Sequence, residues 1–251
     1  MSTGVWPAMI GSVGRDDFGA RLVSNLQASQ VDCAEVEVQN TGGSGMSVAI
    51  MTAGGDYGAV IVSGTNLALV PEDCARQFAA LGSASILILQ NEVPEAVNIA
   101  VAAAARKAGA QVILNAAPAR PVNPALLDHV DVLVVNRVEA EMMSGLKVSD
   151  EAGARAALAA LGSSTRSVIV TLGGEGLVVP TRHGEVSALA PHTVQVKSTH
   201  GAGDCFIGAL AARLASGDAL LDACAYANRA AALYVSLPLD GRDKIKDHLE
   251  G

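Results

Sequence analysis

Aromatic side chains are scarce in this sequence: they make up 3% of 251 residues, whereas hydrophobic residues make up 50%. A core of this size must therefore be packed mainly from Ala, Val, Leu and Ile. No apolar run reaches the roughly 20 residues that a transmembrane helix needs. The first residues also lack the basic and apolar regions of a signal peptide. These absences predict a soluble, cytoplasmic globular protein without a membrane partner.

Positive charge and cysteine motifs are scarce as well. The 17 Lys and Arg against 25 Asp and Glu give a formal charge of −8, so no nucleic-acid partner is expected. The four cysteines, Cys33, Cys74, Cys205 and Cys224, form no C-x-x-C pair, and the five histidines are dispersed. We expect free thiols in a reducing compartment and no metal site built from His or Cys.

From Ser85 onward, short β-type runs alternate with longer helical runs. This rhythm predicts an α/β fold with a doubly wound, mostly parallel sheet. The expected strands are 85–89, 111–114, 132–135 and 167–170, and the expected helices are 94–108, 137–144, 149–161 and 205–216. Right-handed crossovers place the carboxyl ends of parallel strands at one edge, where ligands bind. The segments that directly follow these strands are therefore candidate site segments: 90–92, Asn115, 136–139 and 171–176.

The stretch from Ser198 to Asp204 directly precedes the last expected helix, 205–216. Its glycines allow tight turning, and the amides at a helix N-terminus offer donors to an anion. Asp204 in the first turn can accept a proton from an attacking hydroxyl. Alternatively, the glycines only shape a loop and Asp204 is a first-turn acid that stabilises the helix.

The region before residue 64 has a different pattern. Three β runs, 35–39, 47–52 and 59–63, follow one another without intervening helices. The glycine-rich stretches 41–45 and 53–56 between them are predicted to be hairpin turns, because the first lacks the following helix and the Lys of a phosphate-binding loop. We predict a small β lid over residues 35–63 and an α/β core over residues 1–34 and 64–251.

Together these segments resemble the ribokinase or PfkB-type carbohydrate kinase family over nearly the whole chain. Ser198–Asp204 is similar to the signature D-T-x-G-A-G-D, Thr171–Gly176 to T-L-G-x-x-G, and Asn136–Glu139 to N-x-x-E. Asn115–Arg120 is similar to N-P-A-P-A-R, and Gly11–Asp16 to G-x-V-G-x-D. These five spaced motifs in the family's order make a chance match improbable.

The resemblance implies a role for each matching position. Asp204 would be the general base, and the amides of Gly201, Ala202 and Gly203 would form an anion hole for the phosphoryl group. Further implied contacts are Asn136 with phosphate, Glu139 with Mg²⁺ through water, Thr171, Gly173 and Gly176 with ATP, Asn228 near adenine, and Glu92 with the sugar. The resemblance also implies a homodimer formed through the lid.

Several of these residues also have a purely structural interpretation. Asn136 and Glu139 match an N-terminal capping box, and the glycines of 171–176 could form a hairpin before a strand at 177–180. Asn228 could be an ordinary polar residue on a helix surface.

Two features depart from the family pattern. We expect the chain to lack the N-terminal strand and the G-G-x-x-x-N segment that grips the sugar, which would leave an incomplete lid and unpaired strand edges. Ser198 stands where the family has an Asp that helps bind a monovalent cation. Because a neutral hydroxyl attracts a cation more weakly, activation by K⁺ is left open. The segment 238–242 also departs from the family's usual turn.

The leading hypothesis is ATP-dependent phosphorylation of a hydroxyl on a sugar, nucleoside or similar small molecule. The alternative is a nucleotide-binding protein with little or no kinase activity, because the sugar-gripping segment is not found. A ribokinase-like pentose is the favoured substrate, on the match at Ala119-Arg120 and Glu92.

Overall fold

The central feature of the computed structural model is a six-stranded sheet with the order β10-β9-β8-β7-β6-β5. The structure describes residues 5–51, 57–163, 165–181, 184–238, 241–242, 245 and 249. The strands of this sheet are β5 (Ile86–Gln90), β6 (Gln111–Asn115), β7 (Val132–Asn136), β8 (Ser167–Thr171), β9 (Leu177–Pro180) and β10 (Val186–Leu189). Strands β5 to β8 are parallel, and β9 and β10 are antiparallel additions. The predicted mostly parallel sheet is confirmed.

Alternate residues of β6, β7, β8 and β9 enter two separate cores, one on each face of the sheet. In β6, Leu114 packs into one core and Ile113 into the other, and both are fully buried. The same alternation holds for Leu133 and Val134 in β7. Because both faces are covered, these strands are continuous apolar runs, as parallel sheets require.

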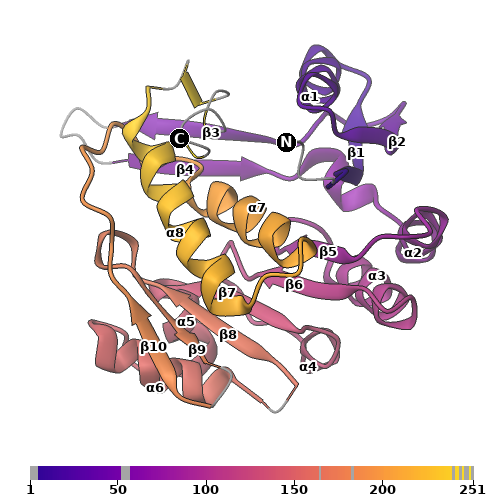
Figure 1. Ribbon diagram of the computed structural model, residues 1–251. Coiled ribbons are helices and arrows are strands. Elements are labelled where there is room, and N and C mark those ends of the chain that lie inside the picture. Colours follow the sequence, from indigo (N-terminus) through magenta and orange to yellow (C-terminus); the bar gives the residue numbers. More distant parts are fainter. Residues whose placement is uncertain are drawn as a thin grey trace.

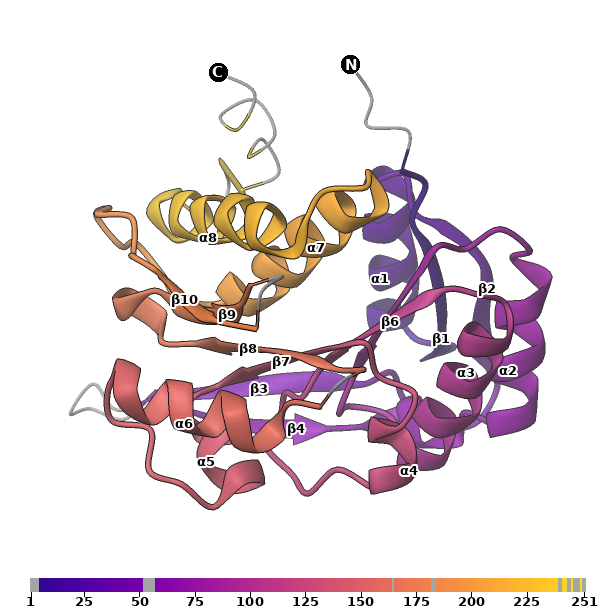
Figure 2. The same ribbon diagram turned by 60° about the horizontal axis from the view of Figure 1, so that its bottom comes forward.

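Helices cover both faces, as a doubly wound fold requires. Figure 2 shows α7 and α8 on one side of β7–β9, with α5 and α6 on the other side. The helices of this part are α2 (Pro71–Ala80), α3 (Glu95–Lys107), α4 (Pro124–Leu127), α5 (Arg137–Ser144), α6 (Glu151–Leu161), α7 (Ala202–Ala215) and α8 (Leu220–Ser236). No helix in the described ranges is both long and apolar enough to cross a lipid bilayer.

The N-terminal part contains two small strand pairs beside the main sheet (Figure 1). Strand β1 (Ala8–Gly14) pairs in parallel with β2 (Asp32–Gln39), and α1 (Asp17–Ala28) connects the two strands. Strand β3 (Met46–Met51) pairs with β4 (Tyr57–Val62) in antiparallel fashion. The predicted lid, residues 35–63, includes most of β2, which pairs with β1, as well as β3 and β4, which pair with each other. The boundaries of the lid therefore remain a prediction. In the described residues β1 pairs only with β2, and β5 only with β6, so both have unpaired edges.

The prediction that residues 41–45 form a hairpin turn is wrong, because the strands they connect, β2 and β3, belong to different sheets. Long-range hydrogen bonds fix this segment instead. The Oδ2 atom of Asp16 accepts the Ser44 amide at 2.7 Å, and Oδ1 accepts the Ser44 hydroxyl at 2.7 Å and the Gly19 amide at 2.8 Å. The Thr65 amide at the start of η1 (Gly64–Ala68) donates to the Gly43 carbonyl at 3.0 Å. The other predicted turn, 53–56, lies outside the described residues.

Asp16 thus caps α1 and holds the glycine-rich segment at the same time. The Ser44 amide, followed by the Gly19 amide and the Ser44 hydroxyl, holds the pKa of Asp16 below its ordinary value. A depressed pKa means that the charged form stabilises the fold above the unfolded-state pKa, and that this contribution is lost as pH falls through the folded-state pKa.

We expect Asp16→Asn to lower the melting temperature at pH 7, because the Asn side chain keeps a capping oxygen but turns an amide donor toward the Ser44 amide. The difference from wild type should begin to narrow as the pH falls below about 4, the ordinary pKa of an Asp, and should shrink further as the pH falls through the lower pKa of the folded state. Thermal melts between pH 7 and pH 3 measure this. Asp17→Asn, at an exposed neighbouring position, is the control and should change little. A constant difference at every pH would contradict the role of the charge.

Candidate active site

Four polar residues lie at the carboxyl ends of the four parallel strands. Gln90, Asn115, Asn136 and Thr171 are the last residues of β5, β6, β7 and β8. Gln90 is in register with Asn115, and Asn136 with Thr171. The expectation that strand ends bring the predicted segments to one edge is therefore confirmed.

Asn136 and Glu139 form a capping box at the start of α5. The Asn136 side chain accepts the Glu139 amide at 3.0 Å. Glu139 Oε2 accepts the Asn136 amide at 2.7 Å, and Oε1 accepts the Asn136 side-chain amide at 2.8 Å. Glu139 is buried, and this burial raises its pKa although the bonds from Asn136 act in the opposite direction. The structural interpretation of this pair is thus correct, and it leaves a further lone pair on each Glu139 oxygen for water.

The segment Thr171–Gly176 forms a tight turn between two paired strands. Val170 and Thr171 of β8 pair with Val178 and Leu177 of β9 around the short helix η2 (Gly173–Glu175). Glu175 forms an ion pair of 2.6 Å with Arg137, the first residue of α5. This contact joins the N-x-x-E motif to the glycine-rich turn, so the two motifs form one surface.

Gly176 closes this turn at a position that no other residue could occupy without strain. Its φ is +90°, and a Cβ there would lie 2.1 Å from the Leu189 carbonyl oxygen. Gly173 and Gly174, in contrast, are exposed, and a Cβ on either would meet no heavy atom within 4 Å. The exposed backbone at these two glycines is accessible to a ligand.

The start of α7 carries the other half of the site. Gly201 is the N-cap residue of α7, with a φ of +78°. The Ala202 amide donates to the Thr199 carbonyl at 3.2 Å, whereas the amides of Gly201 and Gly203 donate to no acceptor in the described part of the chain. Two of the three predicted anion-hole amides are therefore available to a ligand in this conformation.

Asp204 lies in the first turn of α7 and is exposed. Its Oδ1 atom accepts a hydrogen bond of 3.0 Å from the side chain of Gln90, at the end of β5. This bond connects the helix start to the strand edge. The next residue, Cys205, is no candidate nucleophile, because burial raises the pKa of its thiol to about 11.

Glu92 lies beside this edge, in a cavity of about 290 Å³ between the main sheet and the β4–η1 segment. Asn91, Arg120, Ser63 and Asn66 also line the cavity. Glu92 is exposed, and the neighbouring Asn91 is buried and bonded to the Ala116 carbonyl at 2.8 Å. A small polar molecule could contact Glu92 and Arg120 there while remaining close to Gln90.

Asn228 is the predicted residue with the clearest structural role. Its side-chain amide donates to the Ala190 carbonyl at 2.8 Å, which ties α8 to the segment that follows β10. Its side-chain oxygen remains available to a ligand, so the predicted place near adenine stays a prediction.

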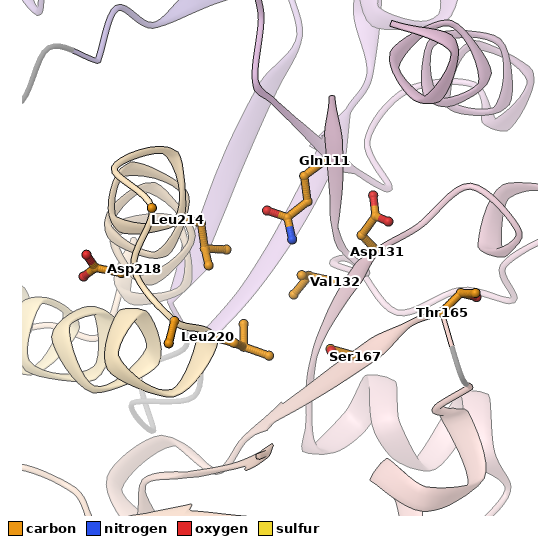
Figure 3. A pocket seen from close by; sticks show the side chains of 10 residues that line it. Gln111, Asp131, Val132, Thr165, Ser167, Leu214, Asp218 and Leu220 are labelled. Atoms are coloured by element: carbon orange, nitrogen blue, oxygen red, sulfur yellow. The ribbon is translucent and has the colours of Figure 1, made fainter. Parts of the chain in front are cut away.

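A larger cavity, of about 370 Å³, lies at the opposite edge of the sheet (Figure 3). Gln111, Val132 and Ser167, at the amino ends of β6, β7 and β8, line it together with the turn between α7 and α8. Its two carboxylates are already paired, Asp131 with Arg106 and Asp218 with Arg213. Because none of the motifs reaches this edge, we do not assign the candidate site to it.

Three contributing residues were not identified from the sequence. They are Gln90, which contacts Asp204, Arg137, which pairs with Glu175, and Arg242, which contacts the loop before α7. Each of these contacts depends on packing between residues that are far apart in the sequence. The segments of these three residues carried a weaker signal: 90–92 and 136–139 each follow a predicted strand, and 238–242 departs from the family's usual turn.

Comparison with known proteins assigns this arrangement to a family. Residues 2–244 match the profile described as pfkB family carbohydrate kinase. The ribokinase of Staphylococcus aureus is 29% identical over 228 residues, which cover 90% of this chain and 75% of that protein. The mouse ribokinase is 31% identical over 215 residues, covering 84% and 67%. A structure of Arabidopsis thaliana ribokinase complexed with ribose and ATP superposes with a TM-score of 0.84 at 27% identity, covering 98% of this chain and 82% of that one.

The N-cap glycine of α7 permits a direct test of the loop geometry. The backbone of Gly201 is left-handed, a conformation that is strained for a residue with a Cβ, and a Cβ at this position would lie 3.0 Å from the Tyr234 hydroxyl. We expect Gly201→Ala to lower the free energy of unfolding by roughly 1–2 kcal/mol, measured by urea denaturation. Gly203→Ala is the matched control, because a Cβ at Gly203 meets no heavy atom within 4 Å. Equal losses for the two variants would contradict this geometry.

Proposed function

This chain belongs to the pfkB family carbohydrate kinases, and we propose that it transfers the γ-phosphoryl group of ATP to a hydroxyl of a pentose or a similar sugar. The observation that carries the proposal is the Gln90–Asp204 hydrogen bond. It brings a carboxylate base, helix-start amides and the ends of parallel strands to one place. The relatives named ribokinase, and the related structure complexed with ribose and ATP, support a pentose as the acceptor.

Asp204 takes the proton of the acceptor hydroxyl as its oxygen attacks the γ-phosphorus. The bond from the γ-phosphorus to the oxygen bridging the β- and γ-phosphates breaks, and ADP leaves. The amides of Gly201 and Gly203, with Ala202 if its turn opens, stabilise the negative charge on the transferred group. Positioning and electrostatics are the main contributions that a protein makes to this reaction.

The nucleotide would bind over the surface formed by the two joined motifs. Thr171 and the exposed backbone of Gly173 would contact it, Gly176 would hold the turn in shape, and Asn136 would face its phosphates. Asn228 would lie toward the adenine. Glu92, in the cavity of about 290 Å³, would bind the sugar.

Mg²⁺ fits this site as an ion held mainly by the phosphates. No group of three or more His, Cys, Asp or Glu side chains among the described residues could hold a metal ion alone. Mg²⁺ usually keeps several waters and uses one or two carboxylates together with substrate phosphates. Glu139, both of whose oxygens accept bonds from Asn136, would therefore reach the ion through water, and the ion would neutralise phosphate charge.

A nucleotide-binding protein with little kinase activity is not favoured by the comparisons, and turnover separates the two functions directly. We expect ATP-dependent phosphorylation of at least one compound in a pool of pentoses, hexoses and nucleosides, measured as ADP formation. ATP binding without turnover of any compound would support the binding protein instead.

Asp204→Asn should lower kcat by about 10²–10⁴-fold, because the amide cannot take up the proton. ATP affinity, measured by calorimetry, should change little. Asp222→Asn is the matched control, since Asp222 is likewise an exposed acid in the first turn of a helix, α8. Undiminished kcat in the Asp204 variant would disprove its role as the base.

Gln90→Leu should lower kcat by about tenfold, because it removes one hydrogen bond to the charged Asp204 carboxylate. The KM for ATP should stay near the wild-type value, because Gln90 holds Asp204 and has no proposed contact with the nucleotide. Gln111→Leu, at the opposite edge of the sheet, serves as the control. A rise in KM with unchanged kcat would show that Gln90 binds a substrate rather than positions the base.

A further inference from the structure

Arg242 lies beneath the loop that leads into α7, with only 7% of its surface exposed. Its two terminal nitrogens donate to backbone carbonyls of this loop, one to His200 and the other to Ser198, each at 2.7 Å. A planar guanidinium holds two carbonyls in a fixed relative geometry, which a flexible ammonium does not. Arg242 therefore fixes the loop from Ser198 to Gly203 from below.

The positive charge of Arg242 has no carboxylate partner within ion-pair distance among the described residues. Within the described part of the chain the guanidinium also stacks on the ring of Tyr234, whose centroid lies 4.4 Å from the guanidinium carbon. Burying a charge is costly unless it is compensated, so the two carbonyls and the aromatic face must supply the compensation. The charge remains unneutralised by any described anion and is available to act on an anion bound nearby.

The Arg242 charge lies near the start of α7, because the guanidinium binds the carbonyl of His200, the residue before the N-cap Gly201. Burial raises the pKa of the Cys205 thiol, the Arg242 charge opposes the rise, and the Asp204 charge adds to it. Arg242 and Asp204 therefore both act on the residue that follows Asp204. A phosphoryl group bound at the Gly201 and Gly203 amides would also lie within range of the Arg242 charge.

Arg242 and the C-terminal end of α8 both pack against the loop from Ser198 to Gly203. The amides of Lys197 and Ser198 donate to the Val235 carbonyl at 2.8 and 3.3 Å. Tyr234 lies directly below Gly201, so that a Cβ on Gly201 would approach its hydroxyl to 3.0 Å. The same tyrosine thus contacts both the guanidinium and the anion-hole loop.

Among the described residues, these contacts make the space beside the loop unfavourable for a monovalent cation. Such an ion would need several oxygen ligands, and one lone pair of each of the Ser198 and His200 carbonyls already accepts from Arg242. Ser198 offers a neutral hydroxyl in place of a carboxylate, and this hydroxyl oxygen accepts the His200 amide at 3.3 Å. A second cation would also be repelled by the guanidinium.

We propose that the Arg242 guanidinium takes the place of a monovalent cation beneath the loop Ser198–Gly203, so that this protein needs no K⁺. The proposal rests on the kinase function proposed above. Arg242 is a positioning residue, because it acts through the loop and its charge without contacting the reacting atoms.

The first experiment needs no variant. Phosphorylation by the wild-type protein is measured with K⁺, Na⁺ or tetramethylammonium as the monovalent cation, at equal ionic strength. We expect rates that agree within about twofold, since the built-in charge is always present. A rise of tenfold or more with K⁺ would overturn the proposal.

The second experiment removes the Arg242 guanidinium by mutation and supplies a guanidinium ion from solution in its place. Arg242→Ala should lower kcat by about 10–100-fold, as expected for lost hydrogen bonds to a charged group, and millimolar guanidinium or methylguanidinium should restore part of it. Arg242→Lys should retain more activity than Arg242→Ala. Arg213→Ala is the matched control, because Arg213 also stacks on a tyrosine of α8, Tyr226, at 5.1 Å, but lies at the far end of α7.

Thermal melting separates this proposal from the kinase function. Low guanidinium concentrations should raise the melting temperature of Arg242→Ala above that in tetramethylammonium and should not raise that of wild type or Arg213→Ala. This result would support the cation role of Arg242 even if no sugar were phosphorylated, in which case the proposed function alone would fail. Equal effects of guanidinium on all three proteins would contradict the proposal whether or not the protein is a kinase.

Discussion

The burial of both faces of the parallel sheet is the constraint on which this structure depends. Because residues such as Ile113 and Leu114 enter different cores, the middle of the central strands β6, β7 and β8 has no room for a polar side chain. Polar residues can occur only at the strand ends. Parallel direction then brings the ends of β5 to β8 to one edge, where Gln90, Asn115, Asn136 and Thr171 meet. The site is therefore a consequence of how the core is built.

The same residues serve folding and the proposed chemistry. Asn136 and Glu139 cap α5, and this capping also fixes the direction of Glu139 beside the candidate nucleotide surface. Gly176 closes a tight turn against the Leu189 carbonyl, and the turn leaves the backbone of Gly173 and Gly174 exposed. A structural interpretation and a functional one thus describe the same hydrogen bonds, because a rigid site needs side chains whose positions are already fixed by the fold.

Features encoded in short stretches were predictable from the sequence, and features made by distant contacts were not. The helix Arg137–Ser144 and the strand Leu177–Pro180 have the bounds that their local patterns predict, because caps, glycines and apolar periodicity act over a few residues. The segment 41–45 was predicted wrongly, since its shape depends on Asp16, 28 residues before Ser44. The Gln90–Asp204 bond spans 114 residues, and no local pattern carries such information. Arg242 likewise lies in a segment that the sequence marked only as a departure from the family.

A tethered guanidinium and a diffusible cation solve the same electrostatic problem in different ways. Arg242 binds the backbone carbonyl of Ser198, and the side chain at this position is a neutral hydroxyl that adds no negative charge to the loop. If Arg242 has the proposed role, a tethered charge also makes the loop geometry independent of the ionic composition of the surroundings. In exchange, the side chain must be ordered and desolvated each time the protein folds, and the Tyr234 ring and two loop carbonyls offset that cost.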